Sequence, residues 1–173
     1  MKNRFTIRIA GLRQGENHLE YEFSAKELGF AERVVTENPS FESLVGPIRV
    51  DLDVVRTGQR LLLSGRVAFR ARLACALCGE EYEQDFNEPL SAEFASCDTD
   101  HPGHGIDAEE IEREPVATDA LELVPIVRDA IHLAVPIAPA CRPDCKGLCA
   151  ICGANLNQAP CECAGLSESS TGH

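Results

Sequence analysis

Hydrophobic and polar residues alternate along most of the first hundred positions, which is typical of β-strands with one buried face. The segments RFTIRIAGL and HLEYEF, within residues 4–23, predict a hairpin or two edge strands. TGQR at 57–60 predicts a tight turn. The segment before this turn, IRVDLDVV, has one apolar face, which consists of Ile48, Val50, Leu52 and Val54.

The clearest strand follows this turn, because RLLLSGRVAFRARLAC keeps the period of two and runs directly into Cys75. Its expected buried face consists of Val67, Phe69, Ala71 and Leu73. Its opposite face carries Arg66, Arg70 and Arg72. EYEQDFNEPLSAEF then predicts a return strand, so we expect residues 1–96 to form a mainly antiparallel β region.

After the sheet region, the apolar residues recur at the spacing of a helix. Residues 97–115 come first, and because they are acidic, turn-rich and without periodicity we expect a mobile loop there. Pro125 fits only the first turn of a helix and Pro136 ends it, so residues 116–140 predict a strand or helix packed on the sheet. The apolar positions of LELVPIVRDAIHLAVP are Leu123, Val127, Ile131 and Ala134.

These elements predict an α+β fold: a twisted antiparallel sheet, or an open barrel-like meander, with one main packed helix. A cysteine-rich zinc-binding segment at 141–163 and a disordered tail at 164–173 complete it. A chain of 173 residues buries enough surface to fold without disulfides. Its beginning lacks the pattern of a signal peptide, and no stretch is long and apolar enough for a membrane helix. We therefore expect a cytoplasmic protein with no membrane contact.

Cysteine is the residue type with the strongest chemical signal, since six of the nine cysteines lie within residues 141–163. CALCG at 75–79 and CAICG at 149–153 share a CxxCG spacing that turns two thiolates toward one ion. Tetrahedral zinc needs four such ligands about 3.8 Å apart and then acts structurally. We expect one or two zinc ions held by Cys75, Cys78, Cys141, Cys145, Cys149, Cys152, Cys161 and Cys163.

The partition of these thiols between ions stays open on sequence alone. In one arrangement the two CxxCG pairs share an ion and the four remaining tail cysteines share another. In the other, the first four tail cysteines share an ion and the 75–78 pair recruits Cys161 and Cys163. Either way the metal joins the end of the sheet to the tail. The alternative is a thiol redox protein, although a reactive CxxC pair usually lies at a helix N-terminus.

The CxxCG pair after a strand, the acidic gap, the helix VRDAIHLAVP and the run DCKGLCAICGANLN together resemble the YceD family, over roughly residues 20–163. The resemblance implies a bacterial or plastid accessory factor, not an enzyme, that is needed for accumulation of large-subunit ribosomal RNA. Its implied partner is the large ribosomal subunit precursor. We expect a monomer without a small-molecule substrate. Since some members lack the C-terminal cluster, we expect the metal to stabilise the protein.

Charge adds one candidate interface. The formal net charge is −12, but the acidic excess lies after residue 75, so any contact with RNA phosphates must be local. The candidate residues are the sheet arginines Arg66, Arg70 and Arg72 with Arg49, Arg56 and Arg60 beside them. An ordinary solvated sheet face is the alternative. Without Trp and with only two Tyr, the chain offers few stacking platforms, and its acidic half suits basic ribosomal proteins.

Overall fold

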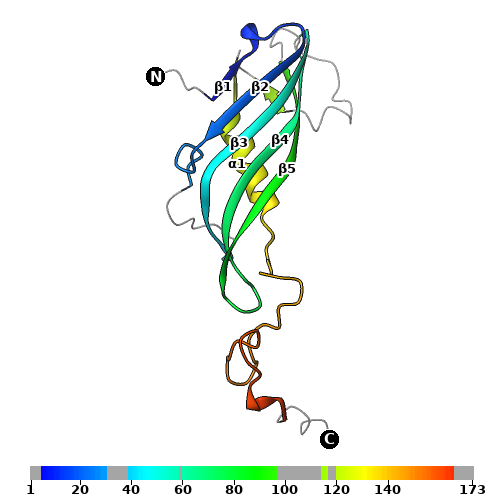
Figure 1. Cartoon of the computed structure of the whole chain (residues 1–173). Coiled ribbons are helices and arrows are strands. Elements are labelled where there is room, and N and C mark those ends of the chain that lie inside the picture. Colours follow the sequence, from blue (N-terminus) through cyan, green and yellow to red (C-terminus); the bar gives the residue numbers. More distant parts are fainter. Residues whose placement is uncertain (1–4, 31–38, 59, 97–113, 117–119, 166–173) are drawn as a thin grey trace, which may run out of the picture.

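The structure, a computed structural model, describes residues 5–30, 39–58, 60–96, 114–116 and 120–165. A five-stranded sheet has the order β2, β3, β4, β5, β6, and a smaller sheet pairs β1 with β7 (Figure 1). The elements are β1 Thr6–Arg8, η1 Ile9–Gly11, β2 Gly15–Phe23, β3 Phe41–Thr57, β4 Arg60–Ala74, β5 Glu81–Ser96, β6 Glu114–Val116, β7 Ala120–Glu122, α1 Leu123–Ala134 and η3 Glu162–Gly165.

The expected antiparallel meander is confirmed, because β2, β3, β4 and β5 pair in chain order with antiparallel neighbours. A two-residue turn joins β3 to β4, with Thr57 opposite Arg60 and Gly58 in the left-handed region at φ 62°. That conformation suits glycine, which lacks a Cβ. The added β6 pairs in parallel with the end of β5, and it lies partly within the stretch that the sequence predicted as a loop.

The hairpin expected within residues 4–23 is wrong, and the alternative of two separate edge strands is correct. β1 pairs with β7 rather than with β2, and the N–H of Leu123 donates to the carbonyl of Phe5 at 2.9 Å. The physical reason lies in η1. The Arg56 guanidinium donates to the carbonyls of Ile9 at 2.8 Å and Leu12 at 3.0 Å, which holds η1 against the end of β3 and separates the two strands.

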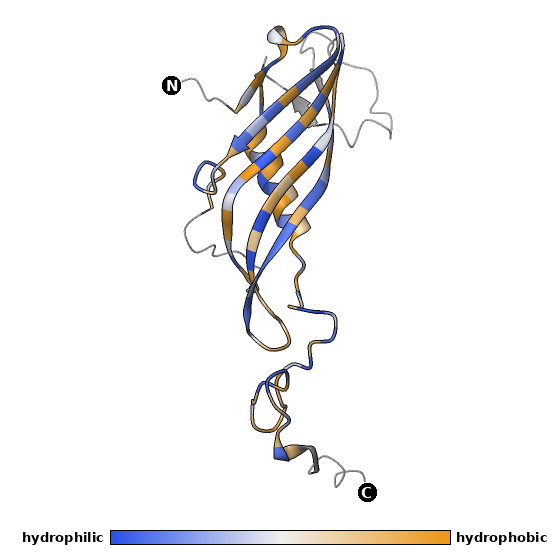
Figure 2. Ribbon diagram, viewed as in Figure 1, coloured by the Kyte–Doolittle hydropathy of each residue, from blue (hydrophilic) through white to orange (hydrophobic). Residues whose placement is uncertain are grey.

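Hydrophobic and polar residues alternate along β2 to β5, and the apolar face packs against α1 (Figure 2). All eight apolar positions predicted on β3 and β4 are buried, as are Leu123, Val127 and Ile131 of the helix, whereas Ala134 is half-buried. Pro125 lies in the first turn of α1 and the helix ends before Pro136, as predicted. At 12 residues α1 is short, and the described part of the chain has no helix able to span a membrane.

An irregularity in β3 bends the sheet. Val45 lies opposite Arg70 and Arg49 lies opposite Ala68, so β3 holds two more residues than β4 between these pairs. Gly46 adopts φ 74° at this point, and an insertion of this kind bends the strand and increases its twist. The sheet therefore curves along its length while α1 covers its buried face (Figure 1).

Gly65, where β4 passes close to the backbone of β3, generates a stability prediction. Gly65 lies on the buried side of β4, where an added Cβ would overlap the Asp51 carbonyl and approach Leu52 Cα to 3.0 Å. We expect Gly65→Ala to lower the free energy of unfolding by about 3 kcal/mol in urea titrations. Gly11→Ala, with no atom within 4 Å of the new Cβ, is the matched control. Equal stability of the two variants would contradict the close approach.

Candidate metal centre

The loop between β4 and β5 forms a tight knuckle at the end of the large sheet. Cys75 follows β4 directly, its N–H donates to the carbonyl of Glu80 at 2.9 Å, and the N–H of Gly79 donates to the carbonyl of Cys75 at 2.8 Å. Gly79 takes the left-handed conformation at φ 73°, which lets the chain turn back into β5. Cys75 and Cys78 are both buried in this knuckle.

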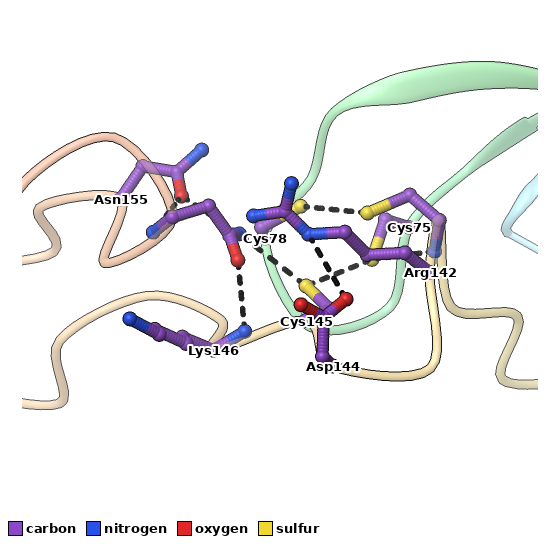
Figure 3. A network of polar contacts seen from close by, with 9 residues as sticks. Cys75, Cys78, Arg142, Asp144, Cys145, Lys146 and Asn155 are labelled. Carbon is purple, nitrogen blue, oxygen red and sulfur yellow. Dashed lines mark hydrogen bonds and ion pairs between the residues drawn. The ribbon is translucent and has the colours of Figure 1, made fainter.

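Two cysteines from beyond the helix complete a cluster of four sulfurs here. The carbonyl of Pro139 accepts the N–H of Ala76 at 2.8 Å, so the chain after α1 runs beside the knuckle. Cys75 Sγ lies 3.8 Å from Cys145 Sγ, and Cys78 Sγ lies 3.8 Å from Cys141 Sγ (Figure 3). All four sulfurs lie within 4.8 Å of one another. We call these four residues the first cluster.

The tail repeats the knuckle and supplies a second cluster. The N–H of Cys149 donates to the carbonyl of Ala154 at 2.8 Å, and the N–H of Gly153 donates to the carbonyl of Cys149 at 2.9 Å. Gly153 has φ 71°, so both knuckles have the same local geometry. The second cluster consists of Cys149, Cys152, Cys161 and Cys163, again with all sulfurs within 4.8 Å.

The structure thus groups the cysteines in neither of the two expected ways. Two further cysteines complete the four sulfurs around each knuckle. They are Cys141 and Cys145 for the first knuckle, and Cys161 and Cys163 for the second. The physical reason is the position at which α1 ends. The chain leaves the helix beside the β4–β5 loop, so the first two cysteines after it reach that loop. The first cluster brings cysteines of the sheet end and of the tail together, which is the arrangement that the expected metal link requires.

The geometry of both clusters fits a metal ion. Metal–sulfur bonds of about 2.3 Å in a tetrahedral site place the sulfurs about 3.8 Å apart, which matches the first cluster. A disulfide would need about 2.05 Å. Backbone N–H groups also point at the sulfurs, from Cys141 to Cys75 Sγ and from Ile151 to Cys149 Sγ, each at 3.4 Å. Such donors favour thiolates, the form that binds metal.

The thiols of the first cluster differ strongly in acidity. Burial raises the pKa of Cys75, but backbone N–H groups, the foremost from Cys141, outweigh it and lower the pKa to about 6. Burial and then the neighbouring thiols raise the pKa of Cys141 to about 12. The buried hydroxyl of Tyr82 lacks a hydrogen-bond partner among the described residues. Burial, then the charges of Cys75 and Cys141, raise the pKa of Tyr82, so its hydroxyl keeps its proton beside these sulfurs.

The second cluster divides in the same way. The N–H groups of Cys152 and Ile151 lower the pKa of Cys149 to about 6, whereas the Cys152 thiol and then burial raise the pKa of Cys163 to about 12. Four neighbouring thiols cannot all ionise by themselves, because their negative charges repel. A bound dication removes this conflict, since it stabilises every coordinating thiolate.

Polar side chains that the sequence reasoning missed connect the two clusters. Asn157 Nδ2 donates to Cys145 Sγ at 3.3 Å, and Asn157 Oδ1 accepts the N–H of Lys146 at 2.9 Å. Glu80, in the first knuckle, accepts Asn155 Nδ2 at 2.9 Å and Gln158 Nε2 at 3.0 Å. The run of amides in ANLNQ, directly after the second knuckle, was the available signal. These bonds hold the second knuckle against the first.

The candidate RNA-binding arginines lie mostly on the outer face of the sheet but differ in their contacts. Arg70 makes two bonds to Asp85 at 2.7 and 3.0 Å and lowers the pKa of that carboxylate. Arg72 pairs with Glu83 at 2.9 Å, and Arg49 lies 3.6 Å from Glu22. Exposed Arg66 has one long bond, 3.5 Å, to a backbone carbonyl. Arg60 is exposed at the start of β4, and half-buried Arg56 binds the backbone near η1.

A protein-family model matches more than half of the chain. The model of the large ribosomal RNA subunit accumulation protein YceD matches residues 63–170, which include most of β4, all of β5 and α1, and both clusters. The chain belongs to the YceD family. The YceD match begins further along the chain than the sequence resemblance indicated, and it extends past the last cysteine.

Curated relatives of this YceD chain come from plants and bacteria. YCED homolog 1, a chloroplastic large ribosomal RNA subunit accumulation protein, is 30% identical in Arabidopsis thaliana, covering 73% of this chain and 46% of the relative. The Zea mays protein of that name is 27% identical, covering 84% and 64%. An uncharacterized Mycobacterium leprae protein is 30% identical, covering 66% and 51%. The chain therefore spans about half to two thirds of these relatives. No solved structure matches.

Asn157 provides a test of the connection between the clusters. Asn157→Leu removes the donor to Cys145 and the acceptor for Lys146, whereas Asn157→Asp keeps an acceptor. We expect Asn157→Leu to speed metal release from the first cluster to a chelator about tenfold, since outer ligand contacts contribute that much to affinity. Metal release from the first cluster is recognised as the kinetic phase that disappears in the Cys78→Ser variant, which lacks a ligand of that cluster. Release unchanged in both Asn157 variants would show that the hydrogen bond to sulfur is immaterial.

Proposed function

We propose that this chain is a non-enzymatic, zinc-stabilised accessory factor in biogenesis of the large ribosomal subunit, needed for accumulation or processing of large-subunit ribosomal RNA. The observation that carries the proposal is the YceD family match across most of β4, β5, α1 and both clusters, together with the names of the two plant relatives. We propose that it acts as a cytoplasmic monomer on a large-subunit precursor.

The donor set supports zinc as the metal of both clusters. Four thiolates in a tetrahedral arrangement favour zinc, and they fill its coordination shell so that no position is left for a reacting water. A site of this kind stabilises structure. It supports an accessory factor that is held in shape by metal, and it gives no role to metal-assisted hydrolysis.

Thiol redox chemistry is the weaker alternative for these cysteines. The CxxC pair of a thiol oxidoreductase usually lies at a helix N-terminus, where the helix dipole favours the thiolate. Here Cys75 follows a strand, Cys149 follows an isolated bridge residue, and neither knuckle begins an α-helix in the described ranges. Each knuckle also faces two further sulfurs, which favours metal binding over a two-thiol exchange.

For contact with RNA we propose Arg66 and Arg60 first, with Arg70, Arg72 and Arg49 beside them. Arg66 and Arg60 are exposed, and none of their described contacts is an ion pair. The other three form exposed ion pairs, which contribute little stability and can exchange a carboxylate for a phosphate at low cost. Arg56 is left out because its guanidinium already holds η1.

Metal content tests the zinc proposal. We expect elemental analysis of the purified protein to give two zinc ions per chain, and one ion after Cys78→Ser or after Cys163→Ser, because each variant removes a ligand from one cluster. Cys97→Ser, outside both clusters, is the control and keeps two. Protein without metal, in which the CxxC pairs form reversible disulfides, would instead support the redox alternative.

Sedimentation tests the ribosomal assignment and the arginine contact together. We expect the wild type to migrate with a large-subunit precursor in gradients of cell lysate. Arg66→Glu reduces the bound fraction and lowers the slope of log affinity against log salt by about one, the effect of one lost phosphate contact.

Lys26→Glu is the control, because it makes the same charge reversal away from the proposed RNA-binding arginines, which we call the arginine row. It leaves binding unchanged. A wild type found only at the top of the gradient removes the ribosomal assignment. Normal binding of the Arg66→Glu variant would mean that the arginine row is an ordinary solvated face.

A further inference from the structure

A groove of about 480 Å³ lies between α1 and β5, on the side of the sheet away from β2. β5 lines it continuously from Glu88 to Phe94, and α1 contributes the residues Ile126, Asp129, Ala130, Leu133 and Ala134. Its two walls are therefore a strand and a helix that both contribute to the hydrophobic core, β5 through Leu90 and Phe94 and α1 through Val127 and Ile131. A partner would find this groove already formed.

The helix wall presents an exposed apolar side chain to solvent. Leu133 is 87% exposed, the highest value among the large apolar side chains that the structure describes. Ile126, Ala130 and Ala134 are only half-buried on the same wall. Exposed apolar residues concentrated along a groove, rather than scattered singly, are typical of a binding surface.

The charged residues that line the groove are all acidic. They are Glu88 and Glu93 on β5 and Asp129 on α1, and none of the described lining residues is basic. The outer face of the sheet differs, because there arginines and carboxylates form pairs such as Arg70 with Asp85. The groove therefore combines apolar contact area with an acidic rim, which favours a positively charged, partly apolar ligand.

The strand wall is also an open sheet edge over most of its length. In the described ranges β5 pairs on this side only at Phe94–Ser96, with β6. Pro89 lies in the open part of the edge, as expected for a residue without an N–H group to pair. Backbone groups at such an edge can pair with an extended peptide, while alternate side chains of the peptide enter the groove beside it.

We propose that this groove binds an extended, Lys- and Arg-rich segment of a protein partner, with apolar side chains placed against Leu133 and basic ones against Asp129. The proposal rests on the proposed function in placing that partner within the large-subunit precursor. RNA fits poorly, because the acidic rim repels phosphates. The chain's own segment 97–113 fits poorly as well, since it carries six acidic residues and one Arg.

The first experiment needs no ribosome. A fluorescent ten-residue peptide that alternates Lys with Val is titrated with the full chain, and a peptide with Glu in place of Lys is the negative probe. We expect the double variant Asp129→Lys with Leu133→Lys to bind the Lys peptide about tenfold more weakly than the wild type. Glu16→Lys with Ile137→Lys changes one carboxylate and one exposed aliphatic side chain in the same way, but at residues that do not line the groove, and keeps wild-type binding.

A photo-crosslinker at position 133, in protein bound to purified precursor, then identifies the occupant by mass spectrometry. A crosslink to a basic protein segment is the expected result. A crosslink to residues 97–113, to a second copy or to RNA, or no crosslink, overturns the proposal. Equal peptide binding by both double variants also overturns it. Failure of the proposed function gives a different result. In that case the wild type does not migrate with the large-subunit precursor in the gradient, although it still binds the Lys peptide.

Discussion

The convergence of four sulfurs at the end of the sheet is the interaction on which the tail depends. Among the described residues from 141 to 163 only Gly147 is buried, and the apolar side chains Leu148 and Ile151 are 47% and 59% exposed. A segment without an apolar core gains little from burial, so hydrophobic packing cannot order it. Cys75 and Cys145 are 70 residues apart, and joining them restricts a long loop of the unfolded chain. A metal ion held by the four sulfurs, as proposed, would therefore supply the order that the composition of the tail does not.

The second cluster builds on this first connection rather than standing alone. Its knuckle is held through Asn155 and Gln158, which donate to Glu80 of the first knuckle. Asn157 adds a donor to Cys145, so an element of the second unit completes the surroundings of a first-cluster sulfur. The position of the second cluster therefore depends on the first cluster, and the position of the first cluster depends on the end of the sheet. The tail extends from the β4–β5 end of the sheet, far from η1 (Figure 1).

The sequence predicted the features that depend on local periodicity and spacing. Alternation placed Val67 and Leu73 in the core, helical spacing and two prolines gave the bounds of α1, and CxxCG predicted both knuckles. It could not predict which cysteines meet, because that depends on where the chain leaves the helix. The pairing of β1 with β7 was hidden for a similar reason, since it depends on Arg56 contacts with carbonyls more than 40 residues away.

The two faces of the molecule differ in how they could recognise a partner. On the outer face, Arg70 and Arg72 already have carboxylate partners. The binding free energy of a phosphate there is therefore only the difference between the new ion pair and the one it replaces. Salt screens such exposed pairs strongly. In the groove, Asp129 lies beside the apolar surface of Leu133, and contact there would exclude water from both. Exclusion of water strengthens the attraction between opposite charges. A chain with a net charge of −12 is therefore better suited to gain affinity from basic protein segments and to use RNA contacts for orientation.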